Sequence, residues 1–238
     1  MNNNININGS GSVAGGTYDT VTINGSGRVN GDLVCHSMTI NGSGAVHGNL
    51  KAAGSFTING SGRVDGSITE SGSVAINGSG KVGGSVHCHT FRSSGSASVD
   101  GDCEGEDVEL SGGGHIGGLL NGEKVRIHLY NNNHPKIGSI GGSDIQVKHR
   151  PGGNGNNPGW HIKILGIEIG SSGGSGEPGY LETDTIEGDV IDLAYTRANR
   201  VSGRVVKIGA GCMIGRVEYT ESAEIDRENS EIGETVQL

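Results

Sequence analysis

A five-residue string, Ile-Asn-Gly-Ser-Gly, recurs in the first third of the chain and constrains its fold more than any other feature. The five copies begin at Ile7, Ile23, Ile40, Ile58 and Ile76, so successive steps are 16, 17, 18 and 18 residues. A period of this length, sustained over several units, is typical of a solenoid, in which each unit buries its apolar side chains against its neighbours. The chain is therefore expected to wind into stacked coils.

The pattern inside each unit indicates strands. Apolar and polar residues alternate in short segments such as 56–58 and 63–65, which is the period of a strand with one buried face. Gly, Asn and Ser, the residues that accept turn geometry, separate these segments. About 17 residues suit one circuit of three short strands. The predicted fold is thus all-β, a right-handed parallel β-helix (β-solenoid) of roughly twelve coils, on the order of 50–60 Å long.

The repeated Asn is expected to stack at one corner of the coil. Equivalent residues of successive coils stack on one another in a solenoid, so the amides could form hydrogen bonds from coil to coil as a structural ladder. Asn also tolerates a left-handed backbone, and the flanking glycines would permit positive φ. The predicted ladder consists of Asn8, Asn24, Asn41, Asn59 and Asn77.

The regularity of the repeat divides the chain into four parts. Residues 1–148 hold the regular solenoid repeats, including degenerate copies after residue 100. Residues 149–179 form a loop-rich insertion with a strand segment, between Gly/Asn/Pro-rich and Gly/Ser-rich loops at 149–159 and 170–179. Residues 180–220 are expected to form C-terminal solenoid coils, where the period shortens to 15 and Ile186 would pair with Val201. Residues 221–238 are predicted to be an acidic, flexible tail.

Composition excludes several classes of protein. The 238 residues include 47 Gly, too many for an ordinary helical protein, and the formal net charge is −9 without a basic cluster, which argues against nucleic-acid binding. No apolar run is long enough to span a membrane, and the first residues do not resemble a secretory signal. Four Cys without framework spacing favour reduced thiols and a cytoplasmic location. The sequence contains no phosphate-binding loop, so no nucleotide or other cofactor is expected.

One histidine pair suggests a metal site. His87 and His89 would lie beside Glu104 and Glu106 of the next coil, and two imidazoles with two carboxylates could hold zinc or another divalent ion. Exposed ion pairs between coils are the favoured interpretation, so no metal is predicted. Cys103 falls on an apolar position of the repeat and is expected to be buried.

Two further functions are weighed against a purely structural one. Residues 100–109 hold six carboxylates, and paired carboxylates are what a carbohydrate-active β-solenoid enzyme would need. The chain has few aromatic residues to bind sugars, however, so no catalytic residue is assigned. The other alternative is a non-polymerising binding rod that presents the 149–159 and 170–179 loops to a partner.

A solenoid whose last coils are uncovered has unpaired backbone groups at both ends. Such edges pair with further strands unless they are capped. Apolar residues at the two ends, Ile5, Ile7 and Val13 at one and Val217 and Tyr219 at the other, are the predicted polymer interface. The residues themselves thus favour self-association, whether into an open filament or a closed end-to-end dimer.

The repeat also resembles a known family. Ile-Asn-Gly-Ser-Gly followed by Val-x-Gly-x-Leu, together with Ile208-Gly-Ala-Gly-Cys-Met-Ile-Gly-Arg-Val-Glu-Tyr219, resembles the bactofilins, or polymer-forming cytoskeletal proteins, over almost the whole chain up to about Tyr219. The resemblance implies a right-handed parallel β-helix that polymerises end to end without nucleotide, as a cytoplasmic scaffold for cell shape, envelope organisation or motility.

The resemblance also implies partners, and the chain departs from the family in two ways. The implied partners are further copies of the same chain, a paralogous bactofilin, and the cytoplasmic face of the membrane or envelope proteins. The chain is longer than the compact family core and carries two loop insertions. Its N-terminus also lacks the short apolar segment by which many members attach to the inner membrane, which leaves peripheral membrane attachment open. The function predicted from the sequence is a non-enzymatic, self-assembling scaffold.

Overall fold

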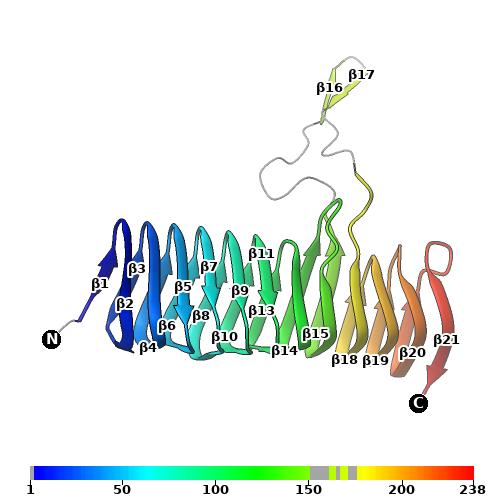
Figure 1. Cartoon of the computed structure of the whole chain (residues 1–238). Coiled ribbons are helices and arrows are strands. Elements are labelled where there is room, and N and C mark those ends of the chain that lie inside the picture. The colour runs from blue at the N-terminus through cyan, green and yellow to red at the C-terminus, as the bar shows by residue number, and fades with distance from the viewer. Residues whose placement is uncertain (1–2, 151–160, 165–166, 171–175) are drawn as a thin grey trace.

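The computed structural model describes residues 3–150, 161–164, 167–170 and 176–238. These residues contain strands and turns but no helix, and those outside 161–170 wind round one axis into a rod with the described ends of the chain at opposite ends (Figure 1). Every strand pairing along the rod is parallel, as the repeat predicts. The all-β solenoid is therefore confirmed.

The strands of the rod follow the repeat in length and order. Several run through a corner of the coil and contribute to two of its sides. Along the first half they are β1 (Ile5–Ile7), β2 (Ser10–Thr17), β3 (Thr20–Ile23), β4 (Ser26–Ile40), β5 (Ser43–His47), β6 (Leu50–Ile58), β7 (Ser61–Val64), β8 (Ile68–Ile76), β9 (Ser79–Val82), β10 (Val86–Ser93), β11 (Ser96–Val99), β12 (Cys103–Glu104) and β13 (Asp107–Leu110). The second half holds β14 (Gly114–Leu129), β15 (Lys136–His149), β18 (Leu181–Leu193), β19 (Thr196–Ile208), β20 (Met213–Ile225) and β21 (Glu231–Gln237).

The coils can be counted along one column of residues that pair from coil to coil. Coil 1 covers residues 4–19, and coils 2 to 12 begin at Thr20, Ser37, Ser55, Ser73, Thr90, Asp107, Lys124, Asp144, Val190, Val205 and Ser222. Each regular coil contributes three strand segments, such as 37–40, 43–47 and 50–52 of coil 3. The shortened period is also confirmed, because Ile186 pairs with Val201 and Ile191 with Val206.

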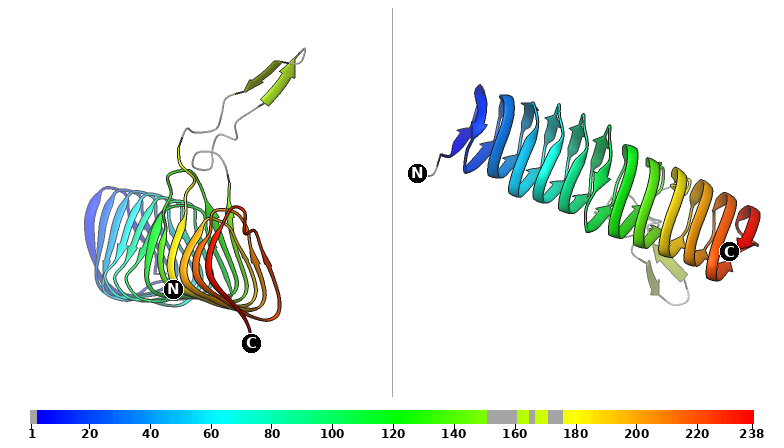
Figure 2. Two further views of the ribbon diagram at one scale, coloured as in Figure 1. Left: turned by 90° about the vertical axis from the view of Figure 1, so that its right-hand side faces the viewer. Right: turned by 90° about the horizontal axis from the view of Figure 1, so that it is seen from below.

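The core is a set of apolar columns that run the length of the rod. Viewed along its axis, the coils superpose around one interior (Figure 2). One column contains Ile5, Val21, Met38, Phe56, Val74, Phe91, Val108, Val125, Ile145, Ile191, Val206 and Ala223. All of these except the first and last are buried, because only the end coils lack a neighbour on one side. Cys103 is fully buried in another column, as expected.

The corner glycines are required for a different reason from the one expected. Positive φ angles among the described glycines occur only at Gly16, Gly31 and Gly211, none of which belongs to the Asn-Gly-Ser-Gly corners. A Cβ on Gly78 would instead come closer than 3.0 Å to the carbonyl oxygen of Gly60 in the coil before. Close stacking of coils, rather than a left-handed backbone, therefore excludes a side chain at this corner.

Two ladders of polar side chains join the coils at their corners. In the first, the amide of Asn24 donates to Asn8 and the amide of Asn41 donates to Asn24, each at 2.8 Å. The ladder continues through Asn59 and Asn77 at 2.8 and 2.9 Å. Each interior amide therefore donates to the coil before it and accepts from the coil after it.

The second ladder was not predicted. Here a side-chain oxygen accepts from the backbone N–H at the equivalent position of the next coil. Asp32 accepts from Asn49 at 2.7 Å, and Asn49 accepts from Ser67 at 2.9 Å. The ladder continues through Ser85 and Asp102 to the backbone of Leu119. The residue type at this position differs from coil to coil, so the sequence shows no repeated residue that would indicate the ladder.

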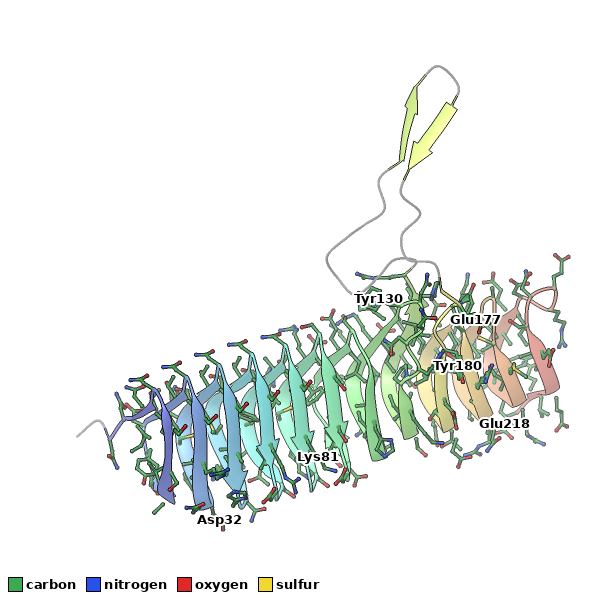
Figure 3. All side chains as sticks on the ribbon, turned by 45° about the horizontal axis from the view of Figure 1, so that its top comes forward. Asp32, Lys81, Tyr130, Glu177, Tyr180 and Glu218 are labelled. Carbon is green, nitrogen blue, oxygen red and sulfur yellow. The ribbon has the colours of Figure 1, made fainter. Side chains whose placement is uncertain are left out.

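The expected insertion leaves the rod from coil 9. The described residues within it form β16 (His161–Ile164) and β17 (Ile167–Gly170), an antiparallel pair where one strand segment was predicted. The predicted 149–159 loop lies outside the described residues from 151 onward, and the 170–179 loop does so over 171–175. At the base, Tyr180 contacts the ring of His134 and lies 3.7 Å from the guanidinium of Arg197. Tyr130, Glu177 and Tyr180 lie together there (Figure 3).

The segment expected to be a flexible tail is the twelfth coil. β20 extends to Ile225, and β21 pairs with it in parallel over Glu231–Gln237. The acidic residues are accommodated because cations of the preceding coil face them: Lys207 lies 3.1 Å from Glu224, and Arg216 lies 2.8 Å from Glu234. The tail prediction was wrong because it treated these carboxylates as unpaired.

Candidate functional site

The N-terminal end of the rod carries three of the predicted interface residues. Ile5 and Ile7 of β1 pair with β3, and Val13 of β2 pairs with β4; no described strand pairs with the outer edge of either β1 or β2. Ile7 is 8% exposed, whereas its counterpart in coil 2, Ile23, is 0% exposed. The outer edge of coil 1 thus offers backbone hydrogen-bonding groups next to incompletely covered apolar side chains.

The C-terminal end lies one coil beyond the residues predicted for it. Val217 and Tyr219 belong to coil 11, where Val217 is fully buried and pairs with Thr235, and Tyr219 pairs with Gln237. They are not at the end, because residues 222–237 form another coil on top of them. In the described part of the chain β21 pairs with β20 alone.

Coil 12 continues the apolar columns of the rod. Ile225 pairs with Ile208 and Ile232 with Ile214, and both residues of coil 12 are half-buried where their partners are buried. The two ends therefore share the features that the sequence predicts for an interface, namely an unpaired strand edge and partly covered apolar residues. What the sequence missed was the continuation of the columns at Ile225 and Ile232, whose spacing from Ile208 and Ile214 matches the repeat.

The four residues considered as a metal site form two separate histidine–carboxylate contacts. His87 Nδ1 lies 2.9 Å from Glu104 Oε2, and His89 Nδ1 lies 2.9 Å from Glu106 Oε1. Among the residues that the structure describes, no group of three or more His, Cys, Asp or Glu side chains converges as a metal site would require. The four residues thus lie where the repeat places them, and each histidine contacts one carboxylate.

The acidic stretch forms contacts between coils. Asp107 lies between Arg92 and Arg126, at 3.2 and 2.8 Å, and Glu109 lies 3.4 Å from His128. Asp107 thus faces cations on both neighbouring coils, whereas burial lowers the pKa of His128, so this histidine is neutral at pH 7. The described contacts of Asp107 and Glu109 are therefore contacts between coils.

A groove of about 700 Å³ crosses coils 8 to 11 on the side of the rod. Its side chains are largely paired with one another: Lys136 lies 2.7 Å from Glu182, and the amide of Asn199 donates to Asp184 at 2.6 Å. The hydrogen bond to Glu182 raises the pKa of Lys136 above its ordinary value. No nucleophile with a neighbouring base lines the groove, so its geometry does not indicate a catalytic site.

All four cysteines are free thiols. Burial raises the pKa of Cys35 and of Cys212 to about 11 and that of Cys88 to about 12, and it raises the pKa of Cys103 well above its ordinary value. Because the thiolate is the reactive form, the folded chain is expected to react slowly with thiol reagents at pH 8.

Colorimetric thiol titration should detect four rapidly reacting thiols only in denaturant. A Ser10→Cys control should add one prompt thiol to the folded chain, and prompt reaction of the native thiols would contradict the expectation.

Comparison with known proteins agrees with these observations. The fold on which the comparison bears is a parallel β-solenoid with paired surface charges. The sequence model of the Bactofilin family, described as polymer-forming cytoskeletal, matches residues 1–71 and 44–131. These matches cover more than half of the 238 residues, and the chain belongs to the bactofilin family.

A curated relative extends the comparison. The uncharacterized protein YhbF of Bacillus subtilis (strain 168) is 34% identical over 121 residues, which make up 51% of this chain and 42% of the relative. The match thus spans about two-fifths of the length of that relative. No solved structure matches the chain. None of the described residues forms a helix long and apolar enough to cross a membrane.

Proposed function

We propose that copies of this chain associate end to end, without nucleotide, into filaments that act as a cytoplasmic scaffold for cell shape, envelope organisation or motility. The observation that carries the proposal is the pair of end coils, whose outer edges pair with no other strand among the described residues and whose apolar side chains are covered on one side only. An edge of this kind gains backbone hydrogen bonds and apolar contacts when another coil stacks on it. The family's description as polymer-forming supports the same conclusion.

The proposal also specifies the partners. The first partner is another copy of the chain, because its end coils carry the same kind of unpaired strand edge and partly covered apolar side chains. A paralogous bactofilin with the same repeat would present equivalent coils. The cytoplasmic face of the membrane and envelope proteins are proposed as the structures that the filament organises.

A charge at either end tests the proposal. Ile5→Asp in coil 1 and Ile232→Asp in coil 12 would each place an unpaired carboxylate in the joint between two rods, which costs several times RT. Since 1.4 kcal/mol corresponds to a factor of ten, we expect the critical concentration for assembly to rise about tenfold or more. Negative-stain electron microscopy and sedimentation without nucleotide would measure the change.

Thr39→Asp provides the matched control. Thr39 lies at an outward-facing position of coil 3. It pairs with Thr22 of coil 2 and Thr57 of coil 4, so it is away from both ends of the rod. This variant should form filaments like the unsubstituted chain, and circular dichroism should show that all three variants remain folded. Undiminished filaments from both end variants, or monomers alone from the unsubstituted chain at every concentration and salt, would contradict the proposal.

A further inference from the structure

Each corner of the first ladder contains an Asn-Gly pair. The string Ile-Asn-Gly-Ser-Gly is identical at all five corners. Asn is thermolabile because the main-chain nitrogen that follows it can attack the carbon of its side-chain amide, and a following Gly leaves that attack unhindered by a Cβ. The identical sequence gives the five pairs the same intrinsic reactivity. Any difference in reactivity between them therefore comes from the structure around each corner.

The corners of coils 2 to 5 are held by the coil before them. In coil 3 the amide of Asn41 donates to Asn24 and its backbone N–H donates to Ile23, each at 2.8 Å. The backbone N–H of Ser43 donates to the carbonyl of Gly25 at 2.9 Å. The corners of coils 2, 4 and 5 form the same three bonds. A ring that joins the side-chain carbon to the next main-chain nitrogen distorts the corner and so breaks these bonds.

The corner of coil 1 is free to move. Asn8 accepts from Asn24 at 2.8 Å, but within the described part of the chain its own amide donates to no acceptor. A Cβ built on Gly9 meets nothing within 4 Å, whereas one built on Gly25 would come closer than 3.0 Å to the carbonyl oxygen of Gly9. Asn8 and Gly9 are both exposed to water. The three bonds that hold an interior corner to the coil before it are therefore absent from this described corner.

We propose that Asn8 is the corner asparagine that undergoes spontaneous deamidation. The main-chain nitrogen of Gly9 loses its proton to water or hydroxide and attacks Cγ of Asn8. A bond between this nitrogen and Cγ forms, the bond between Cγ and Nδ2 breaks, and ammonia leaves with the proton. Water then opens the resulting succinimide at either carbonyl, which gives aspartate or isoaspartate. The net reaction consumes one water, releases one ammonia and adds one negative charge to coil 1, with no change of oxidation state.

The ladder limits the reaction to coil 1. The amide of Asn24 donates to the side-chain oxygen of residue 8, and a carboxylate there is still an acceptor. A hydrogen bond to an ionised carboxylate is stronger than one to an amide oxygen. The amide of Asn24 therefore stays bound after aspartate forms at residue 8, and coil 2 does not become the next site.

The five corner asparagines can be followed separately in one sample. Cleavage before Asp and after Lys and Arg places each of them in a different peptide. The full chain would be kept at mildly alkaline pH, at concentrations where it is monomeric. Mass spectrometry of the peptides over time, with enzymatic methylation of isoaspartate, would measure each conversion. We expect Asn8 to react about fivefold or more faster than Asn41, a factor that corresponds to the net strength of one hydrogen bond.

Two substitutions at residue 8 test the cause. In Asn8→Ala the amide of Asn24 loses its acceptor, so Asn24 should react about fivefold faster than in the unsubstituted chain. In the matched control, Asn8→Asp, the acceptor is kept and Asn24 should react at its original rate. Circular dichroism would show that both variants remain folded.

Three results would overturn the proposal. The first is an equal rate at Asn8 and Asn41 in the unsubstituted chain. The second is an unchanged rate at Asn24 in Asn8→Ala. The third is the same increase at Asn24 in both variants, because the bond from Asn24 to residue 8 would then not govern the reaction.

Discussion

We expect the Gly78→Ala variant to lose about 3 kcal/mol or more of unfolding free energy, near the upper range for overpacking a closed site. The added Cβ would lie closer than 3.0 Å to the carbonyl oxygen of Gly60, and the backbone atom cannot move aside as a flexible side chain could. Coils 4 and 5 would have to separate, breaking the backbone hydrogen bond from Ser79 to Gly60. Denaturant unfolding followed by circular dichroism would measure the loss.

Gly9→Ala is the matched control for this prediction. Gly9 occupies the same corner of the same motif in coil 1, and a Cβ built on it meets nothing within 4 Å. Its free energy of unfolding, measured at concentrations where the chain is monomeric, should change by less than ~1 kcal/mol, the usual scale of a Gly/Ala backbone effect. Equal destabilisation by the two substitutions would show that backbone conformation, not coil stacking, requires glycine at this corner.

We expect Gly9→Val to fold normally and yet to lose filaments. Each corner glycine accommodates the carbonyl of the coil before it, as Gly25 does for Gly9. In coil 1 that space is empty within one chain and would be filled by the terminal coil of a second copy. A branched side chain there should raise the critical concentration about tenfold or more, as the loss of 1.4 kcal/mol at each joint would do. Sedimentation and electron microscopy would detect the change.

Gly113→Val is the control that separates a blocked contact at the end of the rod from a general effect of a branched side chain at a corner. Gly113 is exposed at a corner of coil 7, where a Cβ would meet only the amide oxygen of Asn133 at an ordinary contact distance. It lies far from both ends, so the variant should assemble like the unsubstituted chain. If Gly9→Val forms filaments as readily as Gly113→Val, no coil stacks on coil 1 at this corner.

The sequence predicts most of the rod, because the spacing of the repeat determines which residues pair between neighbouring coils. Identical residues at a fixed spacing, such as Asn24 and Asn41, can pair only with each other when coils stack. The shortened period is visible for the same reason, since Ile186 and Val201 keep their apolar character. The fold class and the place of Ile5, Ile7 and Val13 in the first coil thus follow from spacing alone.

Other features depend on contacts that spacing does not record. The second ladder uses Asp32, Asn49 and Ser67, which share only an oxygen that accepts a backbone N–H. Their one common signal is that each immediately precedes an apolar position of the repeat. The sequence does not predict coil 12, because Glu224 and Glu234 resemble the solvated charges of a flexible tail. In the structure these two carboxylates contact Lys207 and Arg216 of the preceding coil.

The place of the insertion has a consequence for the surface of an assembled filament. The chain leaves coil 9 at residue 149 and returns at 180, where Tyr180 is held by His134 and Arg197. Twelve coils at the strand spacing make each copy about 58 Å long, so an assembled fibre would display one insertion for every 58 Å of its length on average. Any molecule recognised by the β16–β17 hairpin would then be recruited in a fixed ratio of one per copy.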